Sequence, residues 1–541
     1  MNLASLVIGH PADGPALYDR GTWHRWGELR RRAAATGAGL SALGVGPGDR
    51  VAIAWPTSVD FVVAYLAVLA AGCVAVPLNP NSPAAELVRE LEAVTPTALL
   101  AGGAAAASAA EVAAALDSPP LLVLPGPVPG STVSWEQVSG VTPGAATSDT
   151  GTTDADAISA PAAADDAALP VVSRDENDVA VLLFTSGTSG SPKAAMLTHG
   201  NLGANLEQML ALPGDIVRAD DVSLAAVPLF HVFGLNVALG LTLASGAALV
   251  LEERFDAAET LALVRALGIT NLLGVPAMFA AWVALAEHEP AVLATAAAGA
   301  VAAEASGGTV LPRVRRAISG AAALPATVAA GFEKAFGVPV WQGYGLTEAS
   351  PAVSTSLGTG RNRPGSVGQP LPGVEVRLVD EAGEDVLDGD PGEIWVRGRN
   401  VFAGYWRDPD ASAEVLTTDG WLRTGDVGVI GEDGDLFVVD RSKDLIIVSG
   451  FNVYPAEVEK VVGSLPGIAE AVVVGRPDPG SGETVDVVIV VDQGARVSEE
   501  DVRDHCASRL ARYKCPTTVR FVSELPHGLA GKALRRALRQ E

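Results

Sequence analysis

The chain has 541 residues, of which 48% are hydrophobic and 18% are charged, so it is long enough for several packed units and too apolar for global disorder. Its formal net charge of −26 opposes nonspecific binding to nucleic acid or to anionic lipid, because both need a basic surface. Three cysteines, Cys73, Cys506 and Cys515, are too few for a disulfide framework or a zinc cluster, which favours a reducing compartment.

The strongest apolar run, FVVAYLAVLAAGCVAVPL, covers residues 61–78 and has about the minimum length of a membrane span. Gly72 and Pro77 interrupt it. Because these residues break a helix, we predict that the run forms a helix, a glycine turn and a short buried strand. We therefore expect no integral membrane association. The first residues lack the basic region and long apolar core of a secretory signal. We therefore expect a cytoplasmic protein.

Short strand-like runs alternate with Ala- and Leu-rich helical stretches through the first part of the chain. The runs cover residues 51–55, 74–78, 98–102, 121–125 and 179–184. Strands that alternate with helices are typical of a parallel sheet covered by helices. This pattern predicts an α/β fold.

Two changes of composition mark the predicted domain organisation. Residues 142–176 are poor in large apolar side chains and rich in Ala, Asp, Thr and Pro, which is typical of a mobile surface segment. After residue 440, a DRSKD turn is followed by new strand-like runs and a basic helix. We therefore predict a large N-terminal domain over 1–440, a hinge at 441–444 and a small mobile α+β domain over 445–541.

The stretch VLLFTSGTSGSPK, residues 181–193, joins a buried strand to a loop of small and hydroxyl residues. Small residues leave backbone N–H groups free to surround an anion, hydroxyl groups add donors, and Lys193 adds a point charge. The spacing differs from that of a Walker A loop. The composition indicates a phosphate cradle, and a flexible Gly/Ser turn is the alternative for this loop taken alone.

Six further segments follow in order along the chain: VPLFHVFGL (227–235), ISGAAAL (318–324), WQGYGLTEAS (341–350), GWLRTGDVG (420–428), DRSKDLIIVSGFNVYPAEVE (440–459) and LPHGLAGKALRR (525–536). Together with the loop at 181–193, they resemble the acyl-adenylate-forming superfamily of acyl-CoA synthetases, luciferases and nonribosomal adenylation domains. The resemblance runs over essentially the whole chain. It implies a large multi-layer N-terminal domain with α/β subdomains and a small mobile C-terminal domain.

The resemblance also implies an ATP site. The β- and γ-phosphates would be wrapped by Thr185, Ser186, Gly187, Thr188, Ser189, Gly190 and Lys193. Glu348 would help to hold Mg²⁺, a hard cation that needs oxygen ligands. The α-phosphate would lie against Thr347, and the adenine and acyl sites would be lined by Gly320, Ala321, Ala322, Gln342, Gly343, Tyr344, Gly345 and Leu346. Ordinary core packing is the alternative for Tyr344.

The ribose, the acid and the thiol complete the implied site. Asp426 would accept from the ribose hydroxyls, with Arg441 as a donor nearby. Lys532 resembles the lysine that bridges the substrate carboxylate and the α-phosphate, although His527, Gly528, Leu529 and Ala530 stand where Thr residues are common in the family. The family places His231 at the acyl pocket, as a gate or a neighbour of the carboxylate, and a packed or capped histidine is the alternative. Val232, Phe233 and Gly234 after it are small or apolar, which suits an aliphatic or aryl tail. The predicted hinge residue is Lys443, and the coenzyme A segment is Ser449 and Gly450.

These implications predict an acid–CoA ligase that uses ATP, Mg²⁺ and coenzyme A. It would form an acyl-AMP and pyrophosphate from a carboxylic acid, preferably a medium- or long-chain fatty acid, and then acyl-CoA and AMP. The alternatives are transfer to a carrier protein, an aryl or malonate-type acid, and a nucleotide-binding protein without turnover. A second carboxylate would need an arginine such as Arg315 or Arg316. We expect a monomer or a homodimer that binds no nucleic acid.

Overall fold

A computed structural model describes residues 1–126, 133–140, 168–185, 192–288, 311, 313–380, 382–387, 389–441, 446–448, 451–453, 455–478, 482–510, 512–527 and 535–540. The chain forms two compact units. The first contains residues 1–364, 370–375 and 396–422, and the second contains residues 365–369, 376–395 and 423–541. The short strand β16 (Gln369–Pro370) lies at one of the points where the chain passes between the units.

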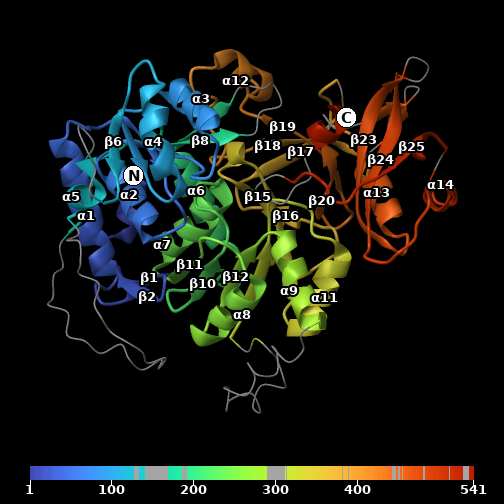
Figure 1. Cartoon of the computed structure of the whole chain (residues 1–541), viewed down its shortest axis with the longest axis horizontal. Helices are drawn as coiled ribbons and strands as arrows, with labels where there is room; N and C mark the ends of the chain where they lie inside the picture. The colour runs from blue at the N-terminus through green and yellow to red at the C-terminus, as the bar shows by residue number, and fades with distance from the viewer. Residues whose placement is uncertain are drawn as a thin grey trace, which may run out of the picture. The chain divides into compact units, whose positions relative to one another are not determined.

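The first unit contains a seven-stranded sheet with the order β7-β6-β5-β3-β4-β8-β9. Figure 1 labels its strands β6 and β8. Its strands are β7 (Val133–Ser134), β6 (Leu121–Leu124), β5 (Ala98–Ala101), β3 (Arg50–Ala54), β4 (Val74–Pro77), β8 (Val179–Thr185) and β9 (Lys193–Thr198). All neighbouring strands are parallel except β8 and β9. The helices that precede, separate or follow these strands along the chain are α1 (Trp26–Ala42), α2 (Val59–Ala70), α3 (Ala84–Val94), α4 (Ala104–Ala114), α5 (Trp135–Ser139) and α6 (His199–Leu210). The five predicted strand runs are thereby confirmed.

The apolar run 61–78 folds as its interruptions predict. Helix α2 begins after Ser58, whose side chain accepts a hydrogen bond from the Phe61 N–H, and every residue of the helix except Asp60 is buried. Gly72 has a φ of +72°, a conformation that glycine adopts without a steric penalty, and β4 follows directly. Among the described residues, no helix is both long enough and apolar enough to cross a membrane.

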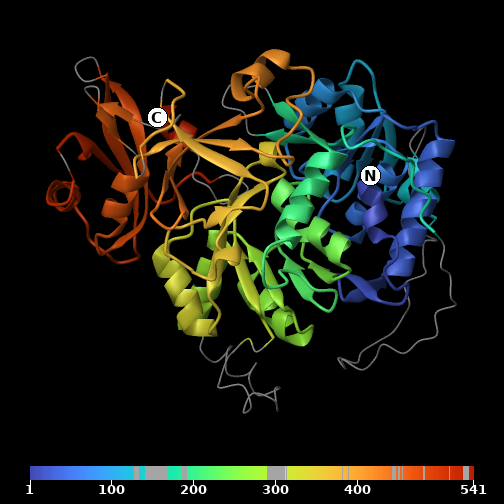
Figure 2. The same ribbon diagram turned by 180° about the vertical axis from the view of Figure 1, so that it is seen from behind.

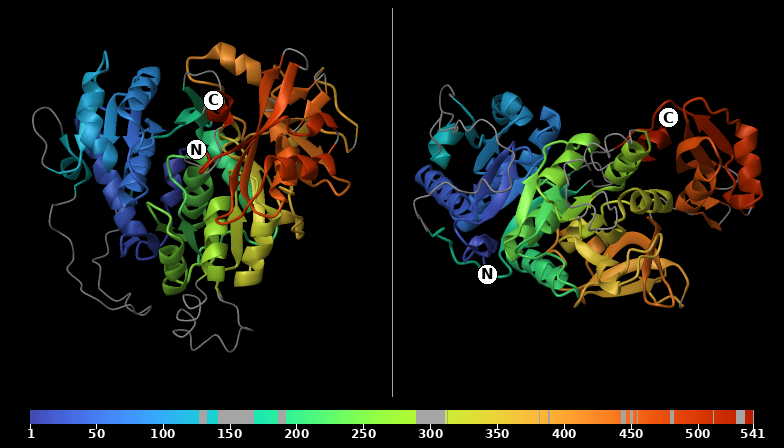
Figure 3. Two further views of the ribbon diagram at one scale, coloured as in Figure 1. Left: turned by 45° about the vertical axis from the view of Figure 1, so that its right-hand side comes forward. Right: turned by 90° about the horizontal axis from the view of Figure 1, so that it is seen from below.

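A second sheet of the first unit has the strand order β15-β14-β13-β12-β10-β11-β1-β2. Its strands are β15 (Ala352–Thr355), β14 (Val340–Gly345), β13 (Arg316–Ser319), β12 (Asn271–Gly274), β10 (Val222–Ala225), β11 (Ala248–Leu251), β1 (Pro15–Asp19) and β2 (Thr22–Arg25). The strands from β14 to β1 are parallel. Figures 2 and 3 show the blue and cyan elements of the first sheet beside the green elements of this one, and η1 (Leu3–Val7) contacts both α2 and α6.

Helices complete this part of the first unit. They are a π-helix (Phe233–Gly240), α7 (Leu241–Ser245), α8 (Ala257–Ala266), α9 (Pro276–His288), α11 (Ala326–Phe336) and α12 (Pro409–Val415), with the 3-10 turns η4 (Thr347–Ala349) and η5 (Leu357–Thr359). Buried aromatic rings join α9 to α11: Phe279 meets Phe332 edge to face, with ring centroids 5.1 Å apart. Edge-to-face rings pack favourably because the positive edge of one meets the negative face of the other.

The second unit contains a four-stranded and a five-stranded sheet. The first has the order β17 (Glu375–Val379), β18 (Gly392–Arg397), β19 (Leu422–Ile430) and β20 (Leu436–Arg441). The second consists of β21 (Ile446–Val448), β22 (Phe451–Val453), β23 (Ile468–Asp478), β24 (Gly482–Val491) and β25 (Thr518–Phe521). Its helical elements are α13 (Pro455–Gly463), α14 (Glu499–Ala507), η7 (Arg512–Lys514) and α15 (Arg535–Gln540).

The strand β24 explains how this second sheet is covered on both faces. Val485 and Val487 pack in one apolar cluster with residues of α13 and α14, whereas Val488 packs in another with Leu538 of α15. Alternate residues of a strand point to opposite faces, so a continuous apolar run requires cover on both. The whole chain is thus a mixed α/β protein, as predicted.

The predicted division of the chain stays a prediction. The unit boundaries follow contacts within the structure and do not test whether 441–444 is a hinge or 445–541 moves. Most of the predicted surface segment 142–176 lies outside the described residues. At its described end, Leu169 is buried and the Val172 N–H donates to the Ala70 carbonyl over 2.8 Å.

Candidate active site

The two ends of the predicted phosphate loop are held by the hairpin of β8 and β9. Thr185 and Lys193 are register partners in this antiparallel pair, and the Thr185 hydroxyl donates to the Lys193 carbonyl over 3.4 Å. Both side chains are partly buried. The other predicted phosphate ligands lie outside the described residues: Ser186, Gly187, Thr188, Ser189 and Gly190.

Glu348 lies in the short 3-10 turn η4, whose backbone is fixed from several sides. The Leu346 N–H donates to the Pro351 carbonyl over 3.1 Å. A Cβ atom on Gly345 would lie 2.1 Å from that same carbonyl oxygen, so only glycine fits there. The side-chain amide of Asn236 donates to the Ser350 carbonyl over 2.7 Å. The backbone position of Glu348 is therefore set by a constrained turn.

Tyr405, which the sequence motifs did not single out, contacts both Glu348 and Lys193. The Tyr405 hydroxyl donates to Glu348 Oε1 over 2.8 Å, and Lys193 Nζ lies 5.3 Å from the centroid of its ring. Tyr405 belongs to the stretch FAGYW, residues 402–406, which carries no charge and no phosphate-loop pattern. Only the pairing of this stretch with β9 brings it to the site, so its sequence gave no direct signal.

The predicted adenine and acyl residues lie at the carboxyl ends of two neighbouring strands. β13 and β14 are parallel, with Ser319 beside Gln342, so residues 320–322 and 343–346 follow at the same edge of the sheet. Ala321 has a φ of +67°, which a non-glycine residue rarely adopts and which marks a tight turn. A Cβ atom on Gly320 would lie 3.1 Å from the Phe233 ring. Gly320 therefore brings two segments of the predicted acyl pocket together.

Gln342 links the segments around it by hydrogen bonds. It is 6% exposed, and its side-chain oxygen accepts a hydrogen bond from the Leu324 N–H over 3.3 Å. Its backbone N–H donates to the Ser356 hydroxyl over 2.9 Å. Gln342 thus fixes the loop after β13 to β14, while Tyr344 beyond it is partly buried.

The predicted acyl segment 231–234 forms the entry to the π-helix. A Cβ atom on Gly234 would lie 2.1 Å from the Pro228 carbonyl oxygen, so the turn needs glycine there. His231 is exposed, and its ring centroid lies 4.8 Å from that of Phe230.

The second unit carries the predicted ribose ligands on adjacent strands. Asp426 of β19 and Arg441 of β20 are register partners. Asp426 is 6% exposed, and its backbone N–H donates to the Thr424 hydroxyl over 3.1 Å. The fold thus places the backbones of these two residues opposite each other in the sheet, and their roles as ribose ligands stay a prediction.

Four further predicted residues lie outside the described part of the chain: Lys443, Ser449, Gly450 and Lys532. The described residues end at His527 before the Lys532 segment, and the His527 ring lies 2.7 Å from Glu470 Oε1. The roles of these residues stay predictions.

The two arginines considered for a second carboxylate lie at the opposite end of β13. Arg315 Nε donates to Asp221 Oδ1 over 3.0 Å, and Arg316 donates to the Gly214 carbonyl. Burial alone would raise the pKa of Asp221, but the hydrogen bonds from Arg315 and its neighbours lower it. Arg315 is thus engaged by Asp221 at the start of the strand, whereas the predicted acyl residues follow its end.

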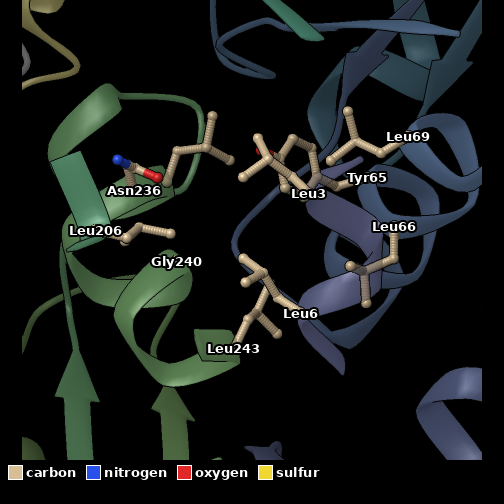
Figure 4. A pocket seen from close by; sticks show the side chains of 10 residues that line it. Leu3, Leu6, Tyr65, Leu66, Leu69, Leu206, Asn236, Gly240 and Leu243 are labelled. Atoms are coloured by element: carbon tan, nitrogen blue, oxygen red, sulfur yellow. The ribbon is translucent and has the colours of Figure 1, made fainter. Parts of the chain in front are cut away.

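A small cavity lies in the first unit, and Asn236 is one of its lining residues (Figure 4). Its volume is ≈ 10 Å³, enough for about one water molecule. The lining residues come from η1, α2, α6, the π-helix and α7: Leu3, Leu6, Tyr65, Leu66, Leu69, Leu206, Leu235, Asn236, Gly240 and Leu243. Burial raises the pKa of the Tyr65 phenol well above its ordinary value. The cavity is too small for a substrate.

Comparison with known proteins decides the family. The AMP-binding enzyme family matches residues 7–406, and the AMP-binding enzyme C-terminal domain matches residues 457–532. This chain belongs to the AMP-binding enzyme family. The resemblance read from the sequence motifs is therefore confirmed.

Named relatives and a solved structure are similar to this AMP-binding enzyme over much or all of its length. Long-chain-fatty-acid–CoA ligase of Bacillus subtilis (strain 168) is 38% identical over 68% of this chain and 62% of that protein. Feruloyl-CoA synthase of an Amycolatopsis species is 36% identical over 97% of this chain and 95% of that protein. The crystal structure of ATP-bound MatB from Rhodopseudomonas palustris is 30% identical, with a TM-score of 0.85 over 100% of this chain and 98% of that chain. This chain is an enzyme of the AMP-forming acid–CoA ligase class.

Proposed function

We propose that this enzyme activates an apolar carboxylic acid, preferably a medium- or long-chain fatty acid, as an acyl-AMP and transfers the acyl group to coenzyme A. The observation that carries the adenylation step is the meeting of Lys193 and Glu348 on the side chain of Tyr405. One residue comes from the end of the phosphate loop and the other from the turn after β14. A cation and a carboxylate held in this way suit a nucleotide triphosphate with its metal ion.

Mg²⁺ is the ion that the family resemblance implies. Within the described ranges there is no cluster of three or more His, Cys, Asp and Glu side chains. A single carboxylate still fits Mg²⁺, because this ion is usually held by one or two carboxylates together with substrate phosphates. Glu348 would hold it through the carboxylate, of which one oxygen already accepts from Tyr405. When bound, the ion would neutralise charge on the phosphate oxygens.

The first half-reaction joins two anions. A carboxylate oxygen attacks the α-phosphorus, and the bond from that phosphorus to the bridging oxygen breaks as pyrophosphate leaves. Because negative charge develops between the reactants, positioning and cationic stabilisation suffice, and no protein nucleophile is needed. Lys193 would hold the leaving phosphates, Thr347 would lie against the α-phosphate, and Lys532 would bridge that phosphate and the carboxylate.

The second half-reaction replaces AMP with a thiol. The sulfur of coenzyme A attacks the acyl carbonyl carbon. The bond between that carbon and the oxygen that carries the phosphate breaks, so that AMP leaves, and the thiol proton passes to solvent. Gly450 would let the pantetheine arm approach the backbone closely, and a rotation at Lys443 would bring that segment to the acyl-AMP. Transfer to a carrier protein is the alternative for this step.

The choice of an apolar acid rests on the residues at the end of β13. Gly320, Ala321 and Ala322 carry no charge, and Phe233 packs against Gly320. Small and aromatic side chains line pockets for apolar groups. The relative named as a feruloyl-CoA synthase is 36% identical over 97% of this chain, which makes an aryl acid the second candidate.

A panel of acids tests the proposal. Hexanoate, decanoate, palmitate, ferulate and malonate are each incubated with ATP and Mg²⁺, with and without coenzyme A, and pyrophosphate, AMP and acyl-CoA are measured. We expect acid-dependent pyrophosphate with decanoate or palmitate, and acyl-CoA only when coenzyme A is present. Highest turnover with ferulate would replace the fatty acid by the aryl acid. No acid-dependent pyrophosphate with any of them would contradict the proposal and favour a nucleotide-binding protein.

Lys532→Ala separates the two half-reactions. We expect it to abolish pyrophosphate release and to spare thioester formation from supplied acyl-AMP, because only the first step needs the bridging cation. Lys334→Ala is the matched control, since Lys334 is an exposed lysine on α11. Equal loss of both half-reactions in Lys532→Ala would contradict the assigned role.

A further inference from the structure

Residues 402–406 are bound to the strand that follows the phosphate loop. The Met196 N–H donates to the Gly404 carbonyl over 2.9 Å, and the Ala403 N–H donates to the Met196 carbonyl over 3.0 Å. A third bond runs from the Trp406 N–H to the Ala194 carbonyl over 2.8 Å, so Tyr405 lies opposite Ala195. The backbone of Tyr405 is therefore fixed with respect to Lys193, two residues before Ala195.

The same stretch is bound to the Glu348 turn. The Phe402 N–H donates to the Glu348 carbonyl over 2.9 Å. The Phe402 ring meets the Tyr405 ring edge to face, with centroids 5.0 Å apart. Tyr405 itself is 8% exposed. Its ring therefore has little freedom to move away from Glu348.

The Tyr405 side chain thus contacts two charged groups through two different parts. Its hydroxyl donates to Glu348 Oε1 over 2.8 Å, and its ring face lies 5.3 Å from Lys193 Nζ. A hydrogen bond to a carboxylate is stronger than one between neutral groups, and a cation over an aromatic ring is attracted by the quadrupole of the ring. A tyrosine that only filled space would need neither contact.

We propose that Tyr405 is a positioning residue for adenylation, which holds Glu348 for the metal ion through its hydroxyl and Lys193 for the phosphates through its ring. This inference rests on the proposed function, because it assigns Glu348 and Lys193 to a metal–nucleotide complex. It predicts that the two parts of one side chain can be separated by substitution.

Tyr405→Phe and Tyr405→Leu make that separation. Phe keeps the ring and removes the hydroxyl, whereas Leu removes both. Tyr65→Phe is the matched control, because Tyr65 is also buried in the first unit, at 5% exposure, and lies on α2. Thermal unfolding of each variant is measured first, and we expect Tyr405→Phe and Tyr65→Phe to unfold close to the wild-type temperature.

Metal binding gives a readout that does not depend on turnover. Mn²⁺ is titrated by electron paramagnetic resonance in the presence of α,β-methylene-ATP, which is not cleaved at the reacting bond. We expect Tyr405→Phe to weaken Mn²⁺ binding about tenfold or more, in line with the loss of a hydrogen bond to a charged group. Tyr65→Phe should leave it unchanged. The same Mn²⁺ affinity in Tyr405→Phe and the wild type would overturn the role of the hydroxyl.

Nucleotide binding without metal tests the ring. Affinity for α,β-methylene-ATP is measured by equilibrium dialysis in the presence of EDTA. We expect Tyr405→Phe to bind it as the wild type does and Tyr405→Leu to bind it several-fold more weakly, because only Leu removes the face that holds Lys193. Equal affinity in Tyr405→Leu and Tyr405→Phe would overturn the role of the ring.

The half-reactions distinguish this inference from the function on which it rests. With an accepted acid, Tyr405→Phe should need about tenfold more Mg²⁺ for half-maximal pyrophosphate release and should form thioester from supplied acyl-AMP at the wild-type rate. Equal loss of both steps would mean a general structural role. If the wild type released no pyrophosphate with any acid, the proposed function would fail, and the Mn²⁺ titration would still decide for or against Tyr405.

Discussion

A buried carboxyl group on α3 makes the stability of the first unit depend on pH. Glu90 is 9% exposed and lies between Leu87 and Leu91, which are 4% and 1% exposed. Its Oε2 atom has no hydrogen-bond partner among the described residues. Burial, together with the charge of Glu86, raises the pKa of Glu90 from 4.5 to about 7. A carboxylate in this position is desolvated, and the nearby charge of Arg89 compensates this only in part.

The direction and size of this pH dependence of stability follow from the raised pKa of Glu90. The folded protein binds the Glu90 proton more tightly than the unfolded chain, so its contribution to stability is complete below pH 4.5 and is lost as the pH rises through about 7. Each pKa unit corresponds to roughly 1.4 kcal/mol, which gives a loss of about 3 kcal/mol at pH 8. For a unit of roughly 400 residues, this loss lowers the unfolding temperature by about 4 °C.

Glu90→Gln removes the charge and keeps the shape. We expect it to unfold near the wild-type temperature at pH 5 and about 4 °C above it at pH 8, as measured by thermal unfolding followed by circular dichroism. Glu92→Gln is the matched control, because Glu92 is an exposed residue of the same helix. A difference between Glu90→Gln and the wild type that stayed constant from pH 5 to pH 8 would refute the reasoning.

Three further predictions concern the active site. Gly345→Ala should reduce acid-dependent pyrophosphate release at least tenfold, because its Cβ would lie 2.1 Å from the Pro351 carbonyl oxygen. Gly46→Ala, whose Cβ would meet no atom within 4 Å, should retain most of the activity. Asp426→Asn should raise the KM for ATP about tenfold and have less effect on the KM for 2′-deoxy-ATP, since a ribose hydroxyl would lose its acceptor; equal changes for both nucleotides would argue against ribose contact. Lys443→Pro should impair thioester formation from supplied acyl-AMP, and an effect on pyrophosphate release alone would exclude the hinge.

The local features of the fold were predictable because they depend on neighbours in the sequence. The run 61–78 is divided by Gly72, and the structure divides it there into α2 and β4. The glycines at 234 and 345 stand where a side chain would collide with a backbone carbonyl, so the motifs that contain them reflect backbone geometry. Such motifs, in order, predicted the family that the comparisons show.

The sequence alone therefore determined five strands of the first sheet, the α/β class and the family, because buried strands and tight glycine turns depend on a few consecutive residues. Only the tertiary structure decided which distant side chains meet. It placed Tyr405 between Lys193 and Glu348, and it paired Arg315 with Asp221 at the far end of β13. These contacts join residues far apart in the chain, and they form only when the strands that carry them pair in register.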